Sequence, residues 1–310
     1  MNRHLLFIWS CAWKALQDAG LLGARLRLNE CISAGRHNVM LLVDFKACYY
    51  DDFKRACAKG GIKIFAFLIA QSVKSLLPAN VIFFFEGDHS REKHIEHLRR
   101  MQQILKASSK FVTAAEASGA HPTLSTLKQL TSMRKSNTIM DSWDFLLLAE
   151  ILKSMGFRVE QATFEAEVTL AKHYHTLRTL HPEMCIAALT KDSDLLFSRH
   201  IDILWRVVRT KREVVVQVVE RQNIMQLLVP RLLCINEDMD FRITEEHLVA
   251  LGIAGGNDYT KRPRGWTLKY LVGFFFKHKE RLQGKDCAGM LEYLSEKHNV
   301  DMRFVARGFI

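Results

Sequence analysis

The chain has 310 residues, of which 48% are hydrophobic and 25% are charged. This composition excludes disorder over most of the chain, and the length predicts one large domain or two modest ones. The 44 Lys and Arg residues outnumber the 33 Asp and Glu residues, so the formal net charge is +11. An excess of this size favours a polyanionic partner, either nucleic acid or an anionic membrane surface, and carries no information about the fold.

The cysteine content and the hydropathy of the chain indicate the kind of cellular compartment to expect. The chain has seven cysteines, an odd number, and no pair has the Cys-x-x-Cys spacing. This pattern argues against a disulfide framework or a thiolate zinc site and predicts a reducing compartment. No apolar run approaches the roughly 20 residues that a bilayer-spanning helix needs. The apolar stretch near the N-terminus is followed at once by Lys14 and Asp18, so we expect an atypical extension over residues 1–12 rather than a secretory signal.

Short apolar segments, each followed by polar residues, predict strands that are buried on both faces of a parallel sheet. The strongest candidates are residues 39–43, 81–85 and 186–189. Two further candidates, residues 203–208 and 214–219, flank a basic turn. We therefore expect the core of the molecule to be built around these segments.

Helix patterns alternate with the predicted strands. Four helices are expected, over residues 141–155, 163–180, 244 onward and 266–282. Gly156 stands where a C-terminal cap belongs, and Thr163 is a good N-cap that would place Glu165 in the first turn. Thr244 opens its helix in the same way, and the last helix is amphipathic and basic. Strands alternating with helices predict an α/β fold with a mostly parallel central sheet flanked by helices.

One segment differs from the rest in composition. Residues 106–137 are rich in Ala, Ser, Thr and Lys and have weak periodicity, which predicts a helical but loosely packed excursion. Between positions 91 and 135 there are nine basic and three acidic residues. This excess is consistent with a solvated helical face and equally with a surface that binds a polyanion.

Acidic side chains follow the predicted core strands. Asp44 follows the first strand, Glu86 the second, and Asp192 and Asp194 the third. Because ligands of an open parallel sheet bind at the carboxyl ends of its strands, we expect these acids to meet at one edge. The helix after residue 163 and a Gly-rich turn near residue 256 add further acids. The complete candidate set is Asp44, Glu86, Glu165, Glu167, Asp192, Asp194 and Asp258.

Seven carboxylates at one place would raise one another's pKa, and divalent cations relieve this repulsion. Hard oxygen ligands are those that Mg²⁺ prefers, and two such ions can activate water and stabilise a leaving oxygen in phosphodiester hydrolysis. An acid after a strand is often only a turn residue or a helix cap, so this prediction depends on the whole set. A basic chain with an acidic metal pocket is the combination expected of a nuclease. We find no P-loop, no nucleophilic triad that the sequence specifies, and no third ligand near the histidine pairs.

Four segments in this order resemble the structure-specific 5′ nucleases, the family of flap endonucleases and XPG-type enzymes. They are residues 84–93, 152–167, 190–197 and 251–259, and the resemblance covers roughly residues 13–278. It implies a PIN-like nuclease fold with a helical arch and a C-terminal helix–two-turn–helix region. The corresponding division of the chain is 13–105 and 141–260 for the nuclease domain, 106–140 for the arch and 261–310 for the DNA-binding region.

The resemblance also implies roles for individual residues. All seven candidate carboxylates would hold two Mg²⁺ ions, for which Mn²⁺ could substitute, and Asp44, Glu86, Glu165 and Asp192 would be catalytic. Lys93 and Arg100, seven apart and so on one helix face, would contact the scissile phosphate. The DNA-binding residues would be Lys261, Arg262, Arg264, Gly265 and Lys269. The implied protein is a monomeric nuclear enzyme that hydrolyses branched or 5′-ended DNA in repair or replication.

The sequence also departs from the family pattern. Glu86 stands where the family usually has Asp, and Arg264-Gly-Trp-Thr replaces the usual Gly-x-Gly-Pro hairpin. The usual Gly near the mature N-terminus is not visible, and no sliding-clamp motif is evident near Ile310. An alternative therefore stays open, namely a non-catalytic relative that acts as an RNA-binding or scaffold protein in gene-expression control. The acidic residue retained at every ligand position favours the enzyme.

Overall fold

The computed structural model describes residues 12–34, 38–87, 94–119, 123–127, 129–130, 142–209, 213–236, 241–255, 263 and 265–298. Its centre is a seven-stranded sheet in the order β1-β7-β6-β5-β2-β3-β4. The strands are β1 (Arg25–Arg27), β2 (Val39–Asp44), β3 (Val81–Phe85), β4 (Arg158–Gln161), β5 (Cys185–Thr190), β6 (Ile203–Arg209) and β7 (Val215–Glu220). Strands β2 to β6 are mutually parallel, and β7 and β1 extend the sheet in antiparallel fashion. The predicted α/β class and mostly parallel sheet are confirmed.

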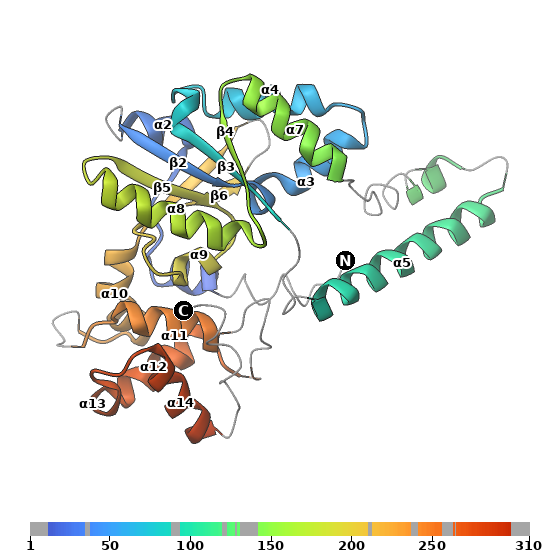
Figure 1. The fold of residues 1–310 in the computed structure, drawn as a ribbon. Helices are drawn as coiled ribbons and strands as arrows, with labels where there is room; N and C mark the ends of the chain where they lie inside the picture. Colours follow the sequence, from blue (N-terminus) through green and yellow to red (C-terminus); the bar gives the residue numbers. More distant parts are fainter. Residues whose placement is uncertain are drawn as a thin grey trace.

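Helices cover both faces of the sheet (Figure 1). The helices of the described chain are α2 (Leu28–Ala34), α3 (Phe45–Cys57), α4 (Ile62–Ser72), α5 (His94–Ala117), α7 (Ser142–Ser154), α8 (Ala166–Leu180), α9 (Asp194–Phe197), α10 (Arg221–Leu233), α11 (Glu245–Ala254), α12 (Leu268–Lys277), α13 (Lys279–Leu282) and α14 (Cys287–His298). A 3-10 turn, Pro78–Asn80, leads into β3. The layered arrangement leaves the carboxyl ends of the central strands as the edge where a site can form.

The alternation of side chains along β2 explains why both layers are needed. All six residues of this strand are buried. Leu41 and Val43 belong to the hydrophobic cluster of α2, α3, α4 and α7, whereas Met40 and Leu42 belong to the cluster on the opposite face. Because successive strand side chains point to opposite faces, a continuously apolar strand requires cover on both sides.

The cluster on the second face extends well beyond the sheet. It joins Leu170 of α8 to residues of α10, α11, α12 and α14, among them Leu228, Leu251, Phe275 and Leu294. Figure 1 shows these C-terminal helices gathered at one end of the molecule, below the sheet and α8. The sheet and the C-terminal helices therefore share one core.

Two predicted helices begin or end elsewhere in the structure. Helix α8 begins at Ala166 with Glu165 at its N-cap, so the prediction of Thr163 as the cap is wrong. The reason is that a backbone hydrogen bond from Gly87 to Phe164 engages the preceding segment, outside the helix. The predicted helix over residues 266–282 is two helices, α12 and α13, which are separated at His278. There the backbone leaves the helical conformation, and Nδ1 of the ring is 3.0 Å from the Tyr293 hydroxyl of α14.

Helix α5 stands clear of the sheet in Figure 1. It has 24 residues and runs without interruption across Lys106, the predicted start of the excursion, and residues 124–127 are also helical. Within the excursion, residues 106–117, 124–127 and 129–130 are helical, while residues 120–122, 128 and 131–141 lie outside the described part. Among the described helices, including this one, none has a long enough apolar run to cross a bilayer.

Candidate functional site

Three neighbouring strands end at the same edge of the sheet and each delivers a carboxylate there. Asp44 is the last residue of β2, Glu86 directly follows β3, and Asp192 lies two residues after β5. Strand β2 pairs with both β3 and β5, so the three acids leave adjacent strands. This convergence is the geometry that the sequence pattern predicts.

Asp44 is the centre of the group and is almost completely buried, with 2% of its surface exposed. Its Oδ1 accepts a hydrogen bond from the Ala47 amide at 3.0 Å, which caps α3, and its Oδ2 accepts one from the Thr190 hydroxyl at 2.9 Å. Burial raises the pKa of Asp44 to about 6, and the charges of Asp192 and Glu86 push it in the same direction against these hydrogen bonds. Asp192 and Glu86 are therefore both close enough to Asp44 to oppose the ionisation of its carboxyl group.

Glu86 is held by a cation and by a helix terminus. The Lys46 ammonium, in the first turn of α3, lies 2.7 Å from its Oε1. The Ala166 amide, at the start of α8, donates to its Oε2 at 3.3 Å. The N-terminus of a helix favours a negative charge, so α8 stabilises this carboxylate. Each of the four carboxylate oxygens of Asp44 and Glu86 thus accepts a hydrogen bond from the protein.

Gly87 fixes the place where the chain leaves β3. Its amide donates to the Phe164 carbonyl at 2.7 Å. A Cβ at this position would stand 2.0 Å from the Ala162 carbonyl oxygen, a distance that no side chain can occupy. The close approach brings Glu86 to the start of α8, where Glu165 is buried at the N-cap and Glu167 is half-buried in the first turn.

The segment after β5 is tied down by its own hydrogen bonds. The Asp192 amide donates to the Thr190 hydroxyl at 3.0 Å, and the Asp194 amide donates to the Asp192 carboxylate at 3.2 Å. Lys191 reaches the Cys48 carbonyl at 2.7 Å, while its own carbonyl accepts from the Trp13 indole at 3.0 Å. The loop is therefore anchored both to α3 and to the N-terminal part of the described chain.

Helix α11 packs directly against the short helix that Asp194 begins. A Cβ at Gly252 would lie 2.4 Å from the Phe197 Cβ, so only glycine permits this approach of α11 to α9. Asp194 itself is buried, with 9% of its surface exposed. The predicted ligand Asp258 follows α11 in sequence and lies outside the described residues.

Several other predicted site residues also fall outside the described part of the chain. They are Lys93, Lys261, Arg262 and Arg264. Arg100 lies in α5, but its side chain is not among those described. Gly265 has a φ of +89°, and Lys269 is exposed in the first turn of α12, which Thr267 caps by accepting from the Tyr270 amide. The predicted roles of these residues stay predictions.

The chemistry of the donors suits a hard cation, because the converging groups are carboxylates with no thiolate among the predicted ligands. Each carboxylate oxygen that accepts one hydrogen bond keeps a second lone pair. Within the described ranges, however, no group of three or more Asp, Glu, His or Cys residues is arranged to hold a metal ion. The described residues therefore fit Mg²⁺ by donor type and do not by themselves complete a set of ligands.

The sequence interpretation did not anticipate the cations at this edge. Lys46 pairs with Glu86, and Lys191 bonds to the backbone of α3. The available signal was position, since Lys46 comes two residues after Asp44 and Lys191 lies between Thr190 and Asp192. A lysine within two residues of a strand-terminal acid emerges at the same edge of the sheet.

Comparison with solved structures shows which known fold this chain has. No protein-family model matches the sequence, and no curated protein sequence matches it either. The structure is similar to the catalytic core of Rad2 in complex with DNA substrate, with a TM-score of 0.54 and 16% identity over 85% of this chain and 68% of that one. A second Rad2–DNA complex gives a TM-score of 0.52 and 13% identity over 86% and 73% of the two chains. The chain has the PIN-like fold of the structure-specific 5′ nucleases.

A further similar structure is human GEN1 in complex with Holliday junction DNA. The TM-score is 0.50 and the identity 14%, over 96% of this chain and 61% of GEN1. At identities this low the likeness establishes the fold, while activity has to be argued from the site.

Proposed function

We propose that the protein is a Mg²⁺-dependent structure-specific 5′ nuclease that hydrolyses phosphodiester bonds of branched or 5′-ended DNA. The observation that supports this most directly is the convergence of Asp44, Glu86 and Asp192 at the ends of three adjacent parallel strands. The shared fold adds support, because the similar Rad2 and GEN1 structures are complexes with DNA.

The charge distribution of the chain supports a nucleic-acid substrate. A net charge of +11 would draw a polyanion to a molecule that gathers carboxylates at the ends of its central strands. Between positions 261 and 281 there are seven basic residues and one acidic residue. Lys269, at the N-terminus of α12, combines a cation with a helix terminus, which suits a phosphate contact.

The residues would divide the chemical work as follows. Asp44, Glu86 and Asp192, joined by Glu165, Glu167, Asp194 and Asp258, would hold the metal ions. Bound Mg²⁺ would supply a Lewis acid and lower the pKa of an attacking water. Thr190 and the α3 amide orient the Asp44 carboxylate, and the N-terminus of α8 orients Glu86. Lys93 and Arg100 would stabilise negative charge on the scissile phosphate.

The decisive experiment is incubation with labelled flap, bubble and blunt DNA duplexes, each with Mg²⁺ and with chelator. We expect cleavage that requires the metal and is lost in Asp192→Ala, while the variant still binds the substrate. A matched control is Asp51→Ala, which removes an exposed acid from α3. Cleavage by Asp192→Ala at the wild-type rate would contradict the site assignment.

One observation favours a second candidate, a non-catalytic relative of the same fold that binds RNA or acts as a scaffold. No complete set of metal ligands is found in the described ranges, and the oxygens of Asp44 and Glu86 are all engaged by protein donors. This candidate predicts salt-sensitive binding of nucleic acid with no cleavage at any Mg²⁺ or Mn²⁺ concentration. Calorimetric titration of Mg²⁺ into the free protein separates the two, because only the enzyme requires binding at this site.

A further inference from the structure

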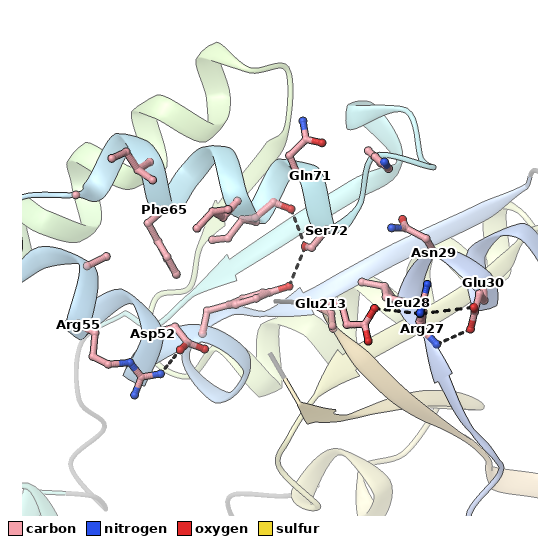
Figure 2. Close-up of a pocket in the computed structure, with 18 of the residues that line it drawn as sticks. Arg27, Leu28, Asn29, Glu30, Asp52, Arg55, Phe65, Gln71, Ser72 and Glu213 are labelled. Atoms are coloured by element: carbon pink, nitrogen blue, oxygen red, sulfur yellow. Dashed lines mark hydrogen bonds and ion pairs between the residues drawn. The ribbon is translucent and has the colours of Figure 1, made fainter. Parts of the chain in front are cut away.

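A large groove lies among α2, α3 and α4, and none of the candidate site residues lines it. Its volume is about 1140 Å³, and its walls come from the end of β1, the three helices and the two residues Glu213 and Val214 before β7. Figure 2 shows Phe65 of α4 on one side of this space and Leu28 of α2 on the other. The groove therefore lies between α2 on one side and the pair of helices α3 and α4 on the other.

The lining of the groove is apolar at depth and along one wall. Leu28, Tyr49 and Phe65 are buried around it, each with less than 10% of its surface exposed. Ile64 and Leu68, one turn apart on α4, remain 68% and 59% exposed. These two side chains extend the apolar lining of the groove to the solvent, which is the kind of surface that interaction sites use.

The rim of the groove carries both acidic and basic side chains, most of which form ion pairs with one another. Arg27 pairs with Glu213 at 3.0 Å and with Glu30 at 3.8 Å, and Arg55 pairs with Asp52. These five side chains carry three negative and two positive charges, and each of them takes part in an ion pair.

Two rim lysines remain beyond these pairs. Lys59 and Lys74 are exposed, and neither forms an ion pair with any residue in the described part of the chain. With four basic and three acidic residues the rim has a net charge of +1, and the two lysines are the basic residues that its ion pairs do not engage. The rim therefore suits a partner that carries acidic groups beside apolar ones.

The open wall of the groove, together with its size, favours a polypeptide over a small molecule as the ligand. Small-molecule pockets have volumes of roughly 300–1,000 Å³ and enclose most of their ligand. This groove is larger, and Ile64 and Leu68 leave one wall open to solvent. We propose that it docks an amphipathic segment of a partner protein, with apolar side chains over α4 and acidic side chains at Lys59 and Lys74. This is the helix-in-groove mode of peptide recognition.

The test uses a phage-displayed library of random peptides, each about four helical turns long. The library is selected on the full wild-type chain and counter-selected on the Leu68→Glu variant. Because Leu68 is exposed, this substitution should leave the fold intact. The expected peptides combine large apolar residues with Asp or Glu. The binding of an enriched peptide is then measured by fluorescence anisotropy.

We expect Leu68→Glu to weaken that binding roughly tenfold or more, as loss of an anchor contact does. The double variant Lys59→Glu/Lys74→Glu should weaken it several-fold, whereas Leu180→Glu, which changes an equally exposed leucine on α8, should leave it unchanged. Hydrogen exchange should show protection of residues 28–33 and 62–72 by the peptide. Asp192→Ala should bind as wild type does, so the result is independent of the nuclease activity.

Three outcomes would overturn the proposal. The first is that no peptide is enriched on the wild type over Leu68→Glu. The second is that the enriched peptides are basic or lack large apolar residues. The third is that the chain self-associates and Leu68→Glu abolishes this, which would make a second copy the occupant of the groove.

Discussion

The Thr190 hydroxyl donates a hydrogen bond of 2.9 Å to the buried carboxylate of Asp44 and so ties the end of β5 to the end of β2. Its oxygen also accepts from the Asp192 amide, so one side chain positions two of the three converging acids. Thr190 is fully buried, and its replacement would leave a buried carboxylate oxygen without a donor.

Thr190→Val, which keeps the shape and removes the hydroxyl, should therefore destabilise the protein by about 1.5–3 kcal/mol, the range for hydrogen bonds to charged groups. Urea unfolding of the metal-free protein measures this change. The control is Thr179→Val, since that exposed hydroxyl bonds only to the preceding turn of its own helix at 2.9 Å. Equal effects of the two substitutions would argue against a special role for Thr190.

Gly87→Ala should be more damaging than its size suggests. The added methyl group would stand 2.0 Å from the Ala162 carbonyl oxygen, so the segment that leads into α8 must move and Glu86 must move with it. We expect a loss of about 3 kcal/mol, at the upper end of the usual range for overpacking, together with loss of cleavage. Thermal unfolding and the flap assay report the two effects.

Gly61→Ala is the matched control for Gly87→Ala. Neither glycine has a positive φ, and the methyl group added at Gly61 would lie 3.6 Å from the Ala56 carbonyl oxygen, an ordinary contact distance. A similar fall in melting temperature for both variants would show that contact with Ala162 is unimportant.

The stability of the protein should fall below neutral pH through His247. Burial lowers the pKa of this imidazole, and its Nδ1 accepts from the Thr244 amide at 3.3 Å in the capping box of α11. Because the unfolded chain takes up a proton near pH 6.5 and the folded chain resists it, the stabilisation is present above pH 6.5 and is lost as the pH falls. His247→Gln keeps a capping-box acceptor without a titrating ring, so it should lose less unfolding free energy than the wild type as the pH falls from 7.5 to 5.5. The raised pKa of Asp44 acts in the opposite direction and equally in both proteins, so it cancels in the comparison.

The control for this pH effect is His181→Gln, which changes an exposed histidine after α8. Its unfolding free energy should follow the wild-type dependence on pH. If the unfolding free energy of His181→Gln no longer changes with pH, or if His247→Gln keeps the wild-type dependence on pH, then groups other than His247 cause the effect.

Lys46→Met should lower the Mg²⁺ concentration needed for half-maximal activity by several-fold. The Lys46 ammonium competes with a metal ion for Glu86, which it contacts at 2.7 Å, and removing a neighbouring positive charge favours cation binding. Lys153→Met breaks an ion pair of similar length on α7, 2.8 Å to Glu150, and should leave the Mg²⁺ requirement unchanged. A higher Mg²⁺ requirement in Lys46→Met would mean that the lysine helps to build the site.

The parts of the fold that could be predicted are those with burial on both faces. Strands β2, β3 and β5 are continuously apolar because helices cover both sides of the sheet centre, and the sequence pattern found all three. Strands β1 and β4 were missed, because they lie at the two ends of the sheet and consist largely of polar, partly exposed residues. Such edge strands carry no hydrophobic pattern that distinguishes them from loops.

The candidate site, too, could be predicted from the sequence only in part. Asp44, Glu86 and Asp192 could be expected together because parallel strands bring their carboxyl ends to one edge. The ion pair of Lys46 with Glu86 could not, since it joins the first turn of α3 to the end of β3 across 40 positions of sequence. The cap position of Glu165 depends likewise on a bond between two distant segments, from Gly87 to Phe164.

The continuous core that joins α8 to α14 has a consequence for protein engineering. Truncating the chain before α11 would remove apolar partners of Leu170, Leu195 and Phe197, which belong to the hydrophobic cluster on the second face of the sheet. The C-terminal helices are thus not a detachable module, and a chimera that exchanges them with a relative's would have to repack this shared interior to remain folded.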